Sequence, residues 1–117
     1  MKRGDIVLIK FPYSDGSSIK VRPAVIVSSD VINSSKTDLI LIAISSNIAN
    51  IQSNDLLINE RDSEFKSTGL HKSSVIKTCK IIHVPQSIIK RRLGGLDKGL
   101  MNRLDQLLLK VLGIQVT

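Results

Sequence analysis

The chain has 117 residues and a mass of 12.9 kDa, which is enough for one domain, spanning residues 1–117, with one hydrophobic core. Hydrophobic residues make up 42% and charged residues 23%, a composition that excludes a chain disordered over most of its length. The formal charge of +7 at pH 7 and the isoelectric point near 9.9 favour a polyanionic partner such as nucleic acid.

Three features that the sequence lacks bear on the location of the protein and on the kinds of site it can form. The longest apolar run, Leu39 to Ile44, is far shorter than the roughly 20 residues that a membrane-spanning helix needs. The first residues lack the apolar stretch and cleavage site of a signal peptide, so a cytoplasmic location is expected. The single cysteine, Cys79, excludes an internal disulfide framework and a cysteine-rich zinc site.

The first half of the chain is rich in β-branched residues, which favour strands over helices. Three strands are predicted there, at 5–11, 20–29 and 39–44. Turn-forming residues at 12–18 predict a hairpin loop, and Pro23 places that point of the second strand at its start or on an edge. A polar connection at 33–37 precedes the third strand, whose continuous apolar run predicts cover on both faces.

The second half begins with a polar, irregular stretch, and a loop is expected over 48–69 with one short strand at 56–58. A strand follows at 74–84, with a bulge or bend near Thr78 where the alternation breaks. Residues 86–92 are expected to form one or two helical turns before a break at Gly94 and Gly95.

The clearest local signal is an amphipathic helix capped by Asp97 and ended by Gly113. Its apolar face consists of Leu100, Met101, Leu104, Leu107, Leu108, Val111 and Leu112. About five strands followed by this helix predict a mainly β (α+β) fold, a small, strongly bent antiparallel sheet or barrel with the C-terminal amphipathic helix packed against it.

Two basic residues at the start of the second strand are candidate ligand contacts. Lys20 and Arg22 are two positions apart, so they face the same side of an extended chain and can act together. The neighbouring glycine- and serine-rich loop could close over a bound ligand. The alternative is an ordinary solvated strand face.

Five short motifs occur in a fixed order along nearly the whole chain: Arg3-Gly4-Asp5-Ile6-Val7, Arg22-Pro23-Ala24-Val25-Ile26-Val27, Ile44-Ser45-Ser46-Asn47, Ser74-Val75-Ile76-Lys77 and Leu93-Gly94. No single motif is specific, but the ordered set resembles the MazF/PemK family of toxin endoribonucleases. The resemblance implies a small SH3-like barrel, a homodimer, and sequence-selective cleavage of single-stranded RNA without a metal or other cofactor. It also implies an antitoxin, which the basic charge of this chain predicts to be acidic.

By this resemblance, the catalytic arginine of the family falls on Arg22 and its catalytic hydroxyl, usually a threonine, falls on Ser45. Attack of the ribose 2′-hydroxyl on the adjacent phosphorus places negative charge on the phosphorane oxygens, to which a planar guanidinium can donate two aligned hydrogen bonds. Ser45 would add a neutral donor, and the products would be a 2′,3′-cyclic phosphate and a 5′-hydroxyl. A guanidinium stays protonated, so the general base is left open.

Five further residues are expected to contact the RNA: Ser17, Lys20, Ser46, Asn47 and Lys77. Lys77 stands where the family often has arginine and is a candidate phosphate contact, the alternative being an ordinary exposed lysine. The chain departs from the family at two positions, with Ser17 where many members have glutamate or glutamine and Cys79 where several have an acidic residue. The resemblance therefore supplies no acid–base group at either position.

Two other groups of side chains are open to a metal or acid–base interpretation: His71, Cys79 and His83, and Asp5, Asp15 and Asp30. The first group has irregular spacing and no obvious fourth ligand, and its two histidines do not match the catalytic positions of the family. The three aspartates stand at a strand start, in a loop and at a strand end, so separate structural roles are expected. No metal site is predicted.

A rival function is a non-catalytic SH3-like barrel that binds nucleic acid or a peptide, because a fold alone does not fix an activity. The combination of Arg22 with a hydroxyl at Ser45 distinguishes the two. Aromatic residues make up only 3% of the chain, which argues against a base-stacking platform. Bases are therefore expected to be read by hydrogen bonds from loops.

Overall fold

The structure, a computed structural model, describes residues 1–11, 20–35 and 37–116. Within these residues one antiparallel sheet has the strand order β4-β5-β3-β2-β1-β6. Its strands are β1 (Asp5–Phe11), β2 (Lys20–Ile26), β3 (Leu39–Ser45), β4 (Leu56–Ile58), β5 (Ser74–Val84) and β6 (Ile89–Gly95). The helices are α1 (Asp30–Ser34) and α2 (Lys98–Leu112), with 3₁₀ helices η1 (Ser63–Thr68) and η2 (Gln86–Ile88).

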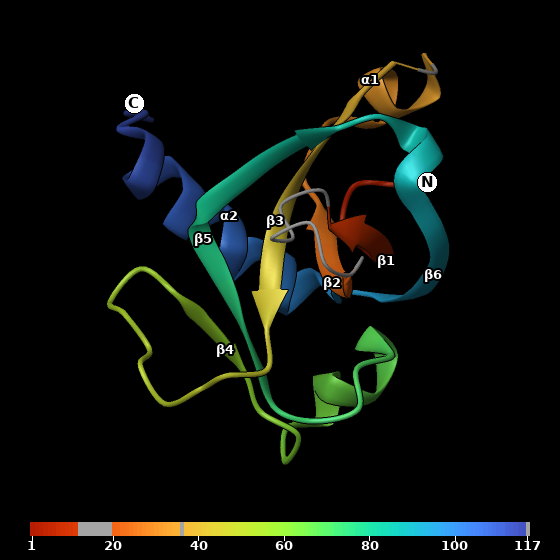
Figure 1. Cartoon of the computed structure of the whole chain (residues 1–117). Coiled ribbons are helices and arrows are strands. Elements are labelled where there is room, and N and C mark those ends of the chain that lie inside the picture. Colours follow the sequence, from red (N-terminus) through yellow and green to blue (C-terminus); the bar gives the residue numbers. More distant parts are fainter. Residues whose placement is uncertain (12–19, 36, 117) are drawn as a thin grey trace.

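The sheet is strongly curled, and the long strand β5 bends along its course (Figure 1). From the end of β5 the chain passes through η2 into β6, which returns to pair with β1. The sheet has β4 and β6 at its two ends, so the curl forms an open half-barrel. This confirms the predicted strongly bent antiparallel sheet with a C-terminal helix.

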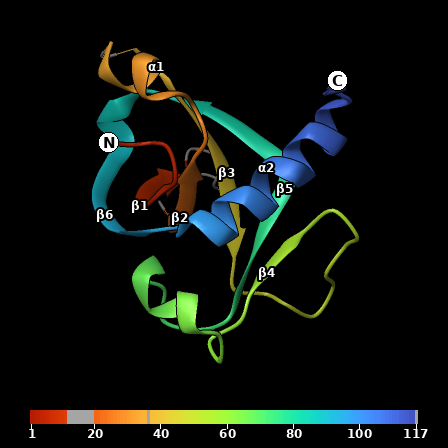
Figure 2. The same ribbon diagram turned by 180° about the vertical axis from the view of Figure 1, so that it is seen from behind.

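Helix α2 begins and ends where the sequence predicts. The Asp97 Oδ1 atom accepts a hydrogen bond of 2.8 Å from the Leu100 backbone N–H, and Gly113 ends the helix with a φ of 69°. The helix lies across the back of the sheet (Figure 2). Its buried leucines are Leu100, Leu104 and Leu108, whereas Leu112 is 54% exposed, so the last part of the apolar face is not covered. No helix of the described residues is long and apolar enough to cross a membrane.

The central strand β3 has buried apolar side chains on both faces, as its apolar run predicts. Ile42 and Ile44 pack in the core beneath α2. Leu39 and Leu41 belong to a second core on the opposite face, inside the curl of the sheet, together with Ala24 of β2. The two inner strands are therefore sandwiched between the helix and the curled sheet.

The predicted second strand is too long at its end. β2 stops at Ile26, and Ser29, predicted to be in the strand, is the N-cap of α1, its Oγ atom accepting from the Ile32 N–H at 3.3 Å. Asp30 follows in the first helical turn, where a negative charge is favourable. The Ser29 side chain hydrogen-bonds the local backbone, and the chain turns away from the sheet at this point.

Two expectations for the second half were wrong. Helical turns were predicted over 86–92, but only η2 is helical, and the residues from Ile89 onward form β6 because β1 offers them a free edge to pair with. Gly94 and Gly95 lie inside this strand and do not break it. The expected loop at 48–69 contains η1 as well as the predicted short strand β4.

The bend predicted near Thr78 is confirmed as an irregularity in the pairing of β5 with β3. The register shifts between the pair Ile44↔Ile76 and the pair Ile42↔Ile81. The position predicted for Pro23 was wrong, because it is an inner residue of β2, which is not an edge strand, and it pairs with Leu8 of β1. It stands just outside the β2–β3 ladder, whose last pair is Ala24↔Ala43. Its missing N–H therefore removes no hydrogen bond from that ladder.

At Gly94 the backbone of β6 passes close to the backbone of η1. A Cβ atom at Gly94 would lie 2.3 Å from the Ser67 carbonyl oxygen, so Gly94→Ala forces the two backbones apart. We expect the free energy of unfolding to fall by about 1–3 kcal/mol, measured by urea denaturation.

Gly99→Ala is the matched control, because its Cβ would meet nothing nearer than the Asp97 Oδ1 atom at 3.6 Å. In the first turn of α2 this change should stabilise the protein by up to about 1 kcal/mol. Equal unfolding midpoints for the two variants would show that the contact at Gly94 does not constrain the fold.

Candidate active site

Arg22 lies on β2 where the strand leaves the core. Residues at 20–22 are exposed, whereas Ala24, Val25 and Ile26 are buried. Because alternate residues of a strand face the same side, Arg22 projects on the face of Ala24, which is the face opposite α2. Lys20 projects on the same side, so the two basic residues share a face as the sequence predicts.

Ser45 is the last residue of β3 and faces the same side. The β2–β3 ladder pairs Ala24 with Ala43, and the same antiparallel register continued by two residues places Arg22 opposite Ser45. Ser45 in turn pairs with Val75 of β5. The structure thus brings the two predicted catalytic residues to one open end of the half-barrel, although they are far apart in sequence.

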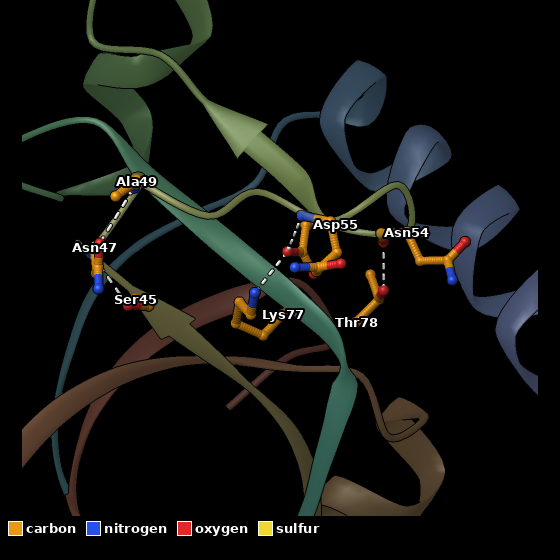
Figure 3. A network of polar contacts seen from close by, with 8 residues as sticks. Ser45, Asn47, Ala49, Asn54, Asp55, Lys77 and Thr78 are labelled. Carbon is orange, nitrogen blue, oxygen red and sulfur yellow. Dashed lines mark hydrogen bonds and ion pairs between the residues drawn. The ribbon is translucent and has the colours of Figure 1, made fainter.

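The hydroxyl of Ser45 is oriented by the turn that follows β3. Its Oγ atom accepts a hydrogen bond of 3.1 Å from the Asn47 N–H, and the Asn47 Oδ1 atom accepts one of 3.1 Å from the Ala49 N–H (Figure 3). A hydroxyl that accepts in this way still has its own hydrogen to donate. Ser46 and Asn47 are exposed beside it, and the Asn47 amide N–H₂ remains a donor group.

Lys77 is not an ordinary exposed lysine. Its Nζ atom lies 2.6 Å from the Asp55 Oδ2 atom, and only 20% of the Lys77 side chain and 5% of the Asp55 side chain are exposed (Figure 3). Removing one partner of a fully buried ion pair costs about 3–5 kcal/mol, and less where one partner is partly hydrated, as Lys77 is. The ion pair with Asp55 therefore holds the Lys77 side chain in one orientation on β5.

Asp55 is a residue of this site for which the sequence predicted no role. Its Oδ2 atom accepts a hydrogen bond of 2.9 Å from the Gln52 N–H, and its own N–H donates to the Gln52 carbonyl at 3.1 Å. Nothing in the sequence indicates that this carboxylate meets a lysine 22 residues later. Only the pairing of β4 with β5 brings the two together.

Lys20 and Arg22 are both exposed. Neither Lys20 nor Arg22 forms an ion pair with any carboxylate among residues 1–11, 20–35 and 37–116. Ser17, the remaining predicted RNA contact, lies outside the described residues. An exposed guanidinium, a hydroxyl donor and an ammonium on one face form a set of donors suited to a phosphodiester.

The histidines and Cys79 do not assemble into a site. His83 contacts the exposed Asp38 with 3.2 Å between Nε2 and Oδ2, and His71 is exposed before β5. Cys79 is exposed on β5. Across the part of the chain that the structure describes, no three His, Cys, Asp or Glu side chains are placed to hold a metal ion.

The aspartates that were open to a metal interpretation have separate structural contacts. Asp5 pairs with Arg92, with 3.0 Å between Oδ1 and Nε, and Asp30 accepts a hydrogen bond of 2.7 Å from the Arg3 backbone N–H. Asp15 lies outside the described residues. The two described aspartates therefore stabilise different parts of the amino-terminal region, as expected.

Comparison with known proteins decides the family. A family model described as the PemK-like, MazF-like toxin of type II toxin-antitoxin systems matches residues 2–112. The chain belongs to this toxin family. The resemblance predicted from the five motifs is thus confirmed over nearly the whole sequence. No curated protein matches the chain at a significant level.

Solved structures support the fold of the toxin. A mycobacterial endoribonuclease in complex with its cognate antitoxin has 16% identity and a TM-score of 0.77, with 100% of this chain and 99% of that chain covered. A chain in a crystal structure of MazE-MazF from Deinococcus radiodurans has 14% identity and a TM-score of 0.76, with 98% of each chain covered. At these identities the likeness concerns the fold alone.

Proposed function

We propose that the protein is a sequence-selective, metal-independent endoribonuclease toxin that cleaves single-stranded mRNA and is neutralised by a cognate antitoxin. The observation that carries the proposal is the cross-strand placement of Arg22 and Ser45 on the open face of the sheet, within a chain of the PemK/MazF-like toxin family. Cleavage would follow attack of the 2′-hydroxyl on the adjacent phosphorus and leave a 2′,3′-cyclic phosphate and a 5′-hydroxyl.

Each of the two residues has a distinct part in this reaction. The Arg22 guanidinium donates two hydrogen bonds to the phosphorane oxygens, on which negative charge accumulates. The Ser45 hydroxyl donates a third from the neighbouring strand. Arg22 pairs with Ile9 of β1 and Ser45 pairs with Val75 of β5, so the sheet sets the backbone positions of both residues before the RNA binds, which favours electrostatic stabilisation.

The antitoxin is expected to carry an acidic, largely disordered segment that occupies the same face. Lys20 and Arg22 attract any polyanion, and an extended acidic peptide can fold as it binds across them. Family relatives crystallised with antitoxins, from mycobacteria and from D. radiodurans, are consistent with such a partner.

The homodimer is expected to form on the other side of the sheet. An apolar groove of about 600 Å³ runs between the C-terminal half of α2 and strands β3 and β5. Its walls include four exposed apolar side chains, Ile40, Ile81, Leu112 and Ile114. Pairing of two such grooves would bury these side chains and leave the face of Arg22 and Ser45 open.

The catalytic assignment predicts that Arg22→Ala lowers the cleavage rate of a long mixed-sequence RNA by about 10²–10³. Ser45→Ala should lower the rate by roughly 10-fold, the value of one neutral hydrogen bond, while Ser45→Thr retains activity. Rates are measured in EDTA, where the wild-type protein is expected to stay active. Because Arg22 is exposed, Arg22→Ala should change the free energy of unfolding by less than about 0.5 kcal/mol.

Arg61→Ala, which removes an exposed arginine from a loop beyond β4, is the matched control and should cleave normally. Wild-type rates for Arg22→Ala would remove the residue from the mechanism. RNA binding without cleavage by the wild-type protein would favour the non-catalytic barrel.

The dimer proposal predicts a mass of twice 12.9 kDa by light scattering. Leu112→Glu places a charge in the groove and should shift the protein to monomers at micromolar concentration. Val31→Glu is the control, because Val31 is 80% exposed on α1 and is not part of the groove wall. A wild-type monomer would contradict the proposal.

The antitoxin proposal predicts competition between RNA and antitoxin. The probe is an RNA with a mapped cleavage site and a 2′-deoxy residue there, which binds without being cut. Its affinity should fall as antitoxin is added, and both affinities should weaken with salt because each depends on charge neutralisation. Simultaneous binding of both ligands with unchanged affinities would show that the antitoxin acts elsewhere.

A further inference from the structure

The inference concerns Asp55, and it rests on the proposed ribonuclease function. Asp55 and its neighbour Asn54 fasten the end of the loop at 46–55 to consecutive residues of β5. The Asp55 carboxylate meets the Lys77 ammonium, and the Asn54 carbonyl accepts a hydrogen bond from the Thr78 hydroxyl (Figure 3). Thr78 is fully buried, so this attachment is part of the folded structure.

The loop joined in this way is the one that begins at Ser45. Its first residues are fixed by the hydrogen bonds from Asn47 to Ser45 and from Ala49 to Asn47. Its last residues are fixed by the pair of hydrogen bonds between Gln52 and Asp55. Asp55 therefore links the loop that follows the Ser45 hydroxyl to the strand that carries Lys77.

Lys77 lies on the face of Ser45. Ser45 pairs with Val75, and Lys77 is two residues beyond Val75, so its side chain projects to the same side of β5 as Val75 and Ser45. Side chains in such diagonal positions are roughly 7–8 Å apart at the backbone, within the reach of a lysine. Asp55 precedes Leu57 of β4 by two residues and comes to the same face, since Leu57 pairs with Val75.

The two partners are unequally accessible. The Asp55 side chain is 5% exposed and already has two donors, from Gln52 and Lys77, whereas the Lys77 side chain keeps 20% exposure. An ammonium has three hydrogens, of which Asp55 takes one. The carboxylate is thus hidden behind the cation, and the positive member of the pair is presented to a ligand.

We propose that Asp55 is a positioning residue that holds the Lys77 ammonium beside Arg22 and Ser45, where it donates to a phosphate of the bound RNA. Asp55 itself does not touch the RNA. Without Asp55 the lysine side chain samples many rotamers. Binding a phosphate must then offset the conformational entropy that this side chain loses. Asp55 therefore acts on RNA recognition through Lys77 alone.

The central variant is Asp55→Asn, which keeps an oxygen for the Gln52 N–H but removes the charge that holds Lys77. We expect kcat/KM for a short RNA with a mapped cleavage site to fall about 5–20-fold, mainly through KM. Lys77→Met should give a similar loss, and the slope of log Kd for the 2′-deoxy RNA against log salt should become shallower by about 0.7, one phosphate contact. In the Lys77→Met background, Asp55→Asn should have no further effect on either measurement.

Two results would contradict the proposal. If Asp55 only neutralises positive charge, Asp55→Asn makes the surface more basic and RNA binds more tightly, which would overturn the proposal. A further loss of affinity from Asp55→Asn in the Lys77→Met background would also overturn it, because Asp55 would then act without Lys77. If Asp55→Asn does not fold, Asp55→Glu is the second variant. It keeps the charge but moves the Lys77 ammonium by about the length of one methylene group. Its kcat/KM should still fall while its thermal midpoint stays near that of wild type.

Glu64→Gln is the matched control, since it breaks the ion pair between Glu64 and Arg103 of α2 and should leave kcat/KM unchanged. Cleavage by the wild-type protein in the same assay distinguishes a failure of this inference from a failure of the proposed function. An active wild-type protein with unaltered Asp55→Asn kinetics overturns this inference alone, whereas an inactive wild-type protein overturns the proposed function and this inference with it.

Discussion

The length over which β2 and β3 are covered on both faces determines where the candidate site lies. Helix α2 covers one face and the curled sheet covers the other, and the paired, buried segment ends at Ala24 and Ala43. The next positions on the same face are Arg22 and Ser45. The backbone hydrogen bonds of the sheet thus also set where the backbones of these two residues lie, because Arg22 pairs with β1 and Ser45 with β5.

Features with a local signal could be predicted from the sequence. β1 follows from its β-branched residues, β3 from its apolar run, and α2 from its apolar face and its two caps at Asp97 and Gly113. β6 could not be predicted, because the residues from Ile89 to Gly95 have no alternation and form a strand only where β1 offers a free edge. A break was predicted at Gly94 and Gly95 for the same reason: the pairing of Gly94 with Ile6 and its close contact with η1 are not visible in the sequence.

The residues of the candidate site also differ in whether the sequence could predict them. Arg22 and Ser45 were identified by resemblance, and the observed register then explains why an arginine and a hydroxyl from separate motifs share one face. Lys77 was recognised by position, but its partner was missed, since an ion pair over 22 residues leaves no local pattern. The site and the apolar groove lie on opposite faces of the sheet, so the proposed dimer contact would leave the face of Arg22 and Ser45 uncovered.

The exposed thiol on β5 has a practical consequence. Cys79 is the chain's only cysteine and lies two residues beyond Lys77, within the irregular part of the strand. A maleimide dye or a nitroxide therefore couples at a single position of the unmodified polypeptide. Its fluorescence or mobility reports events beside the candidate site in real time, and two labels in a pair of subunits give one distance that constrains how those subunits are arranged.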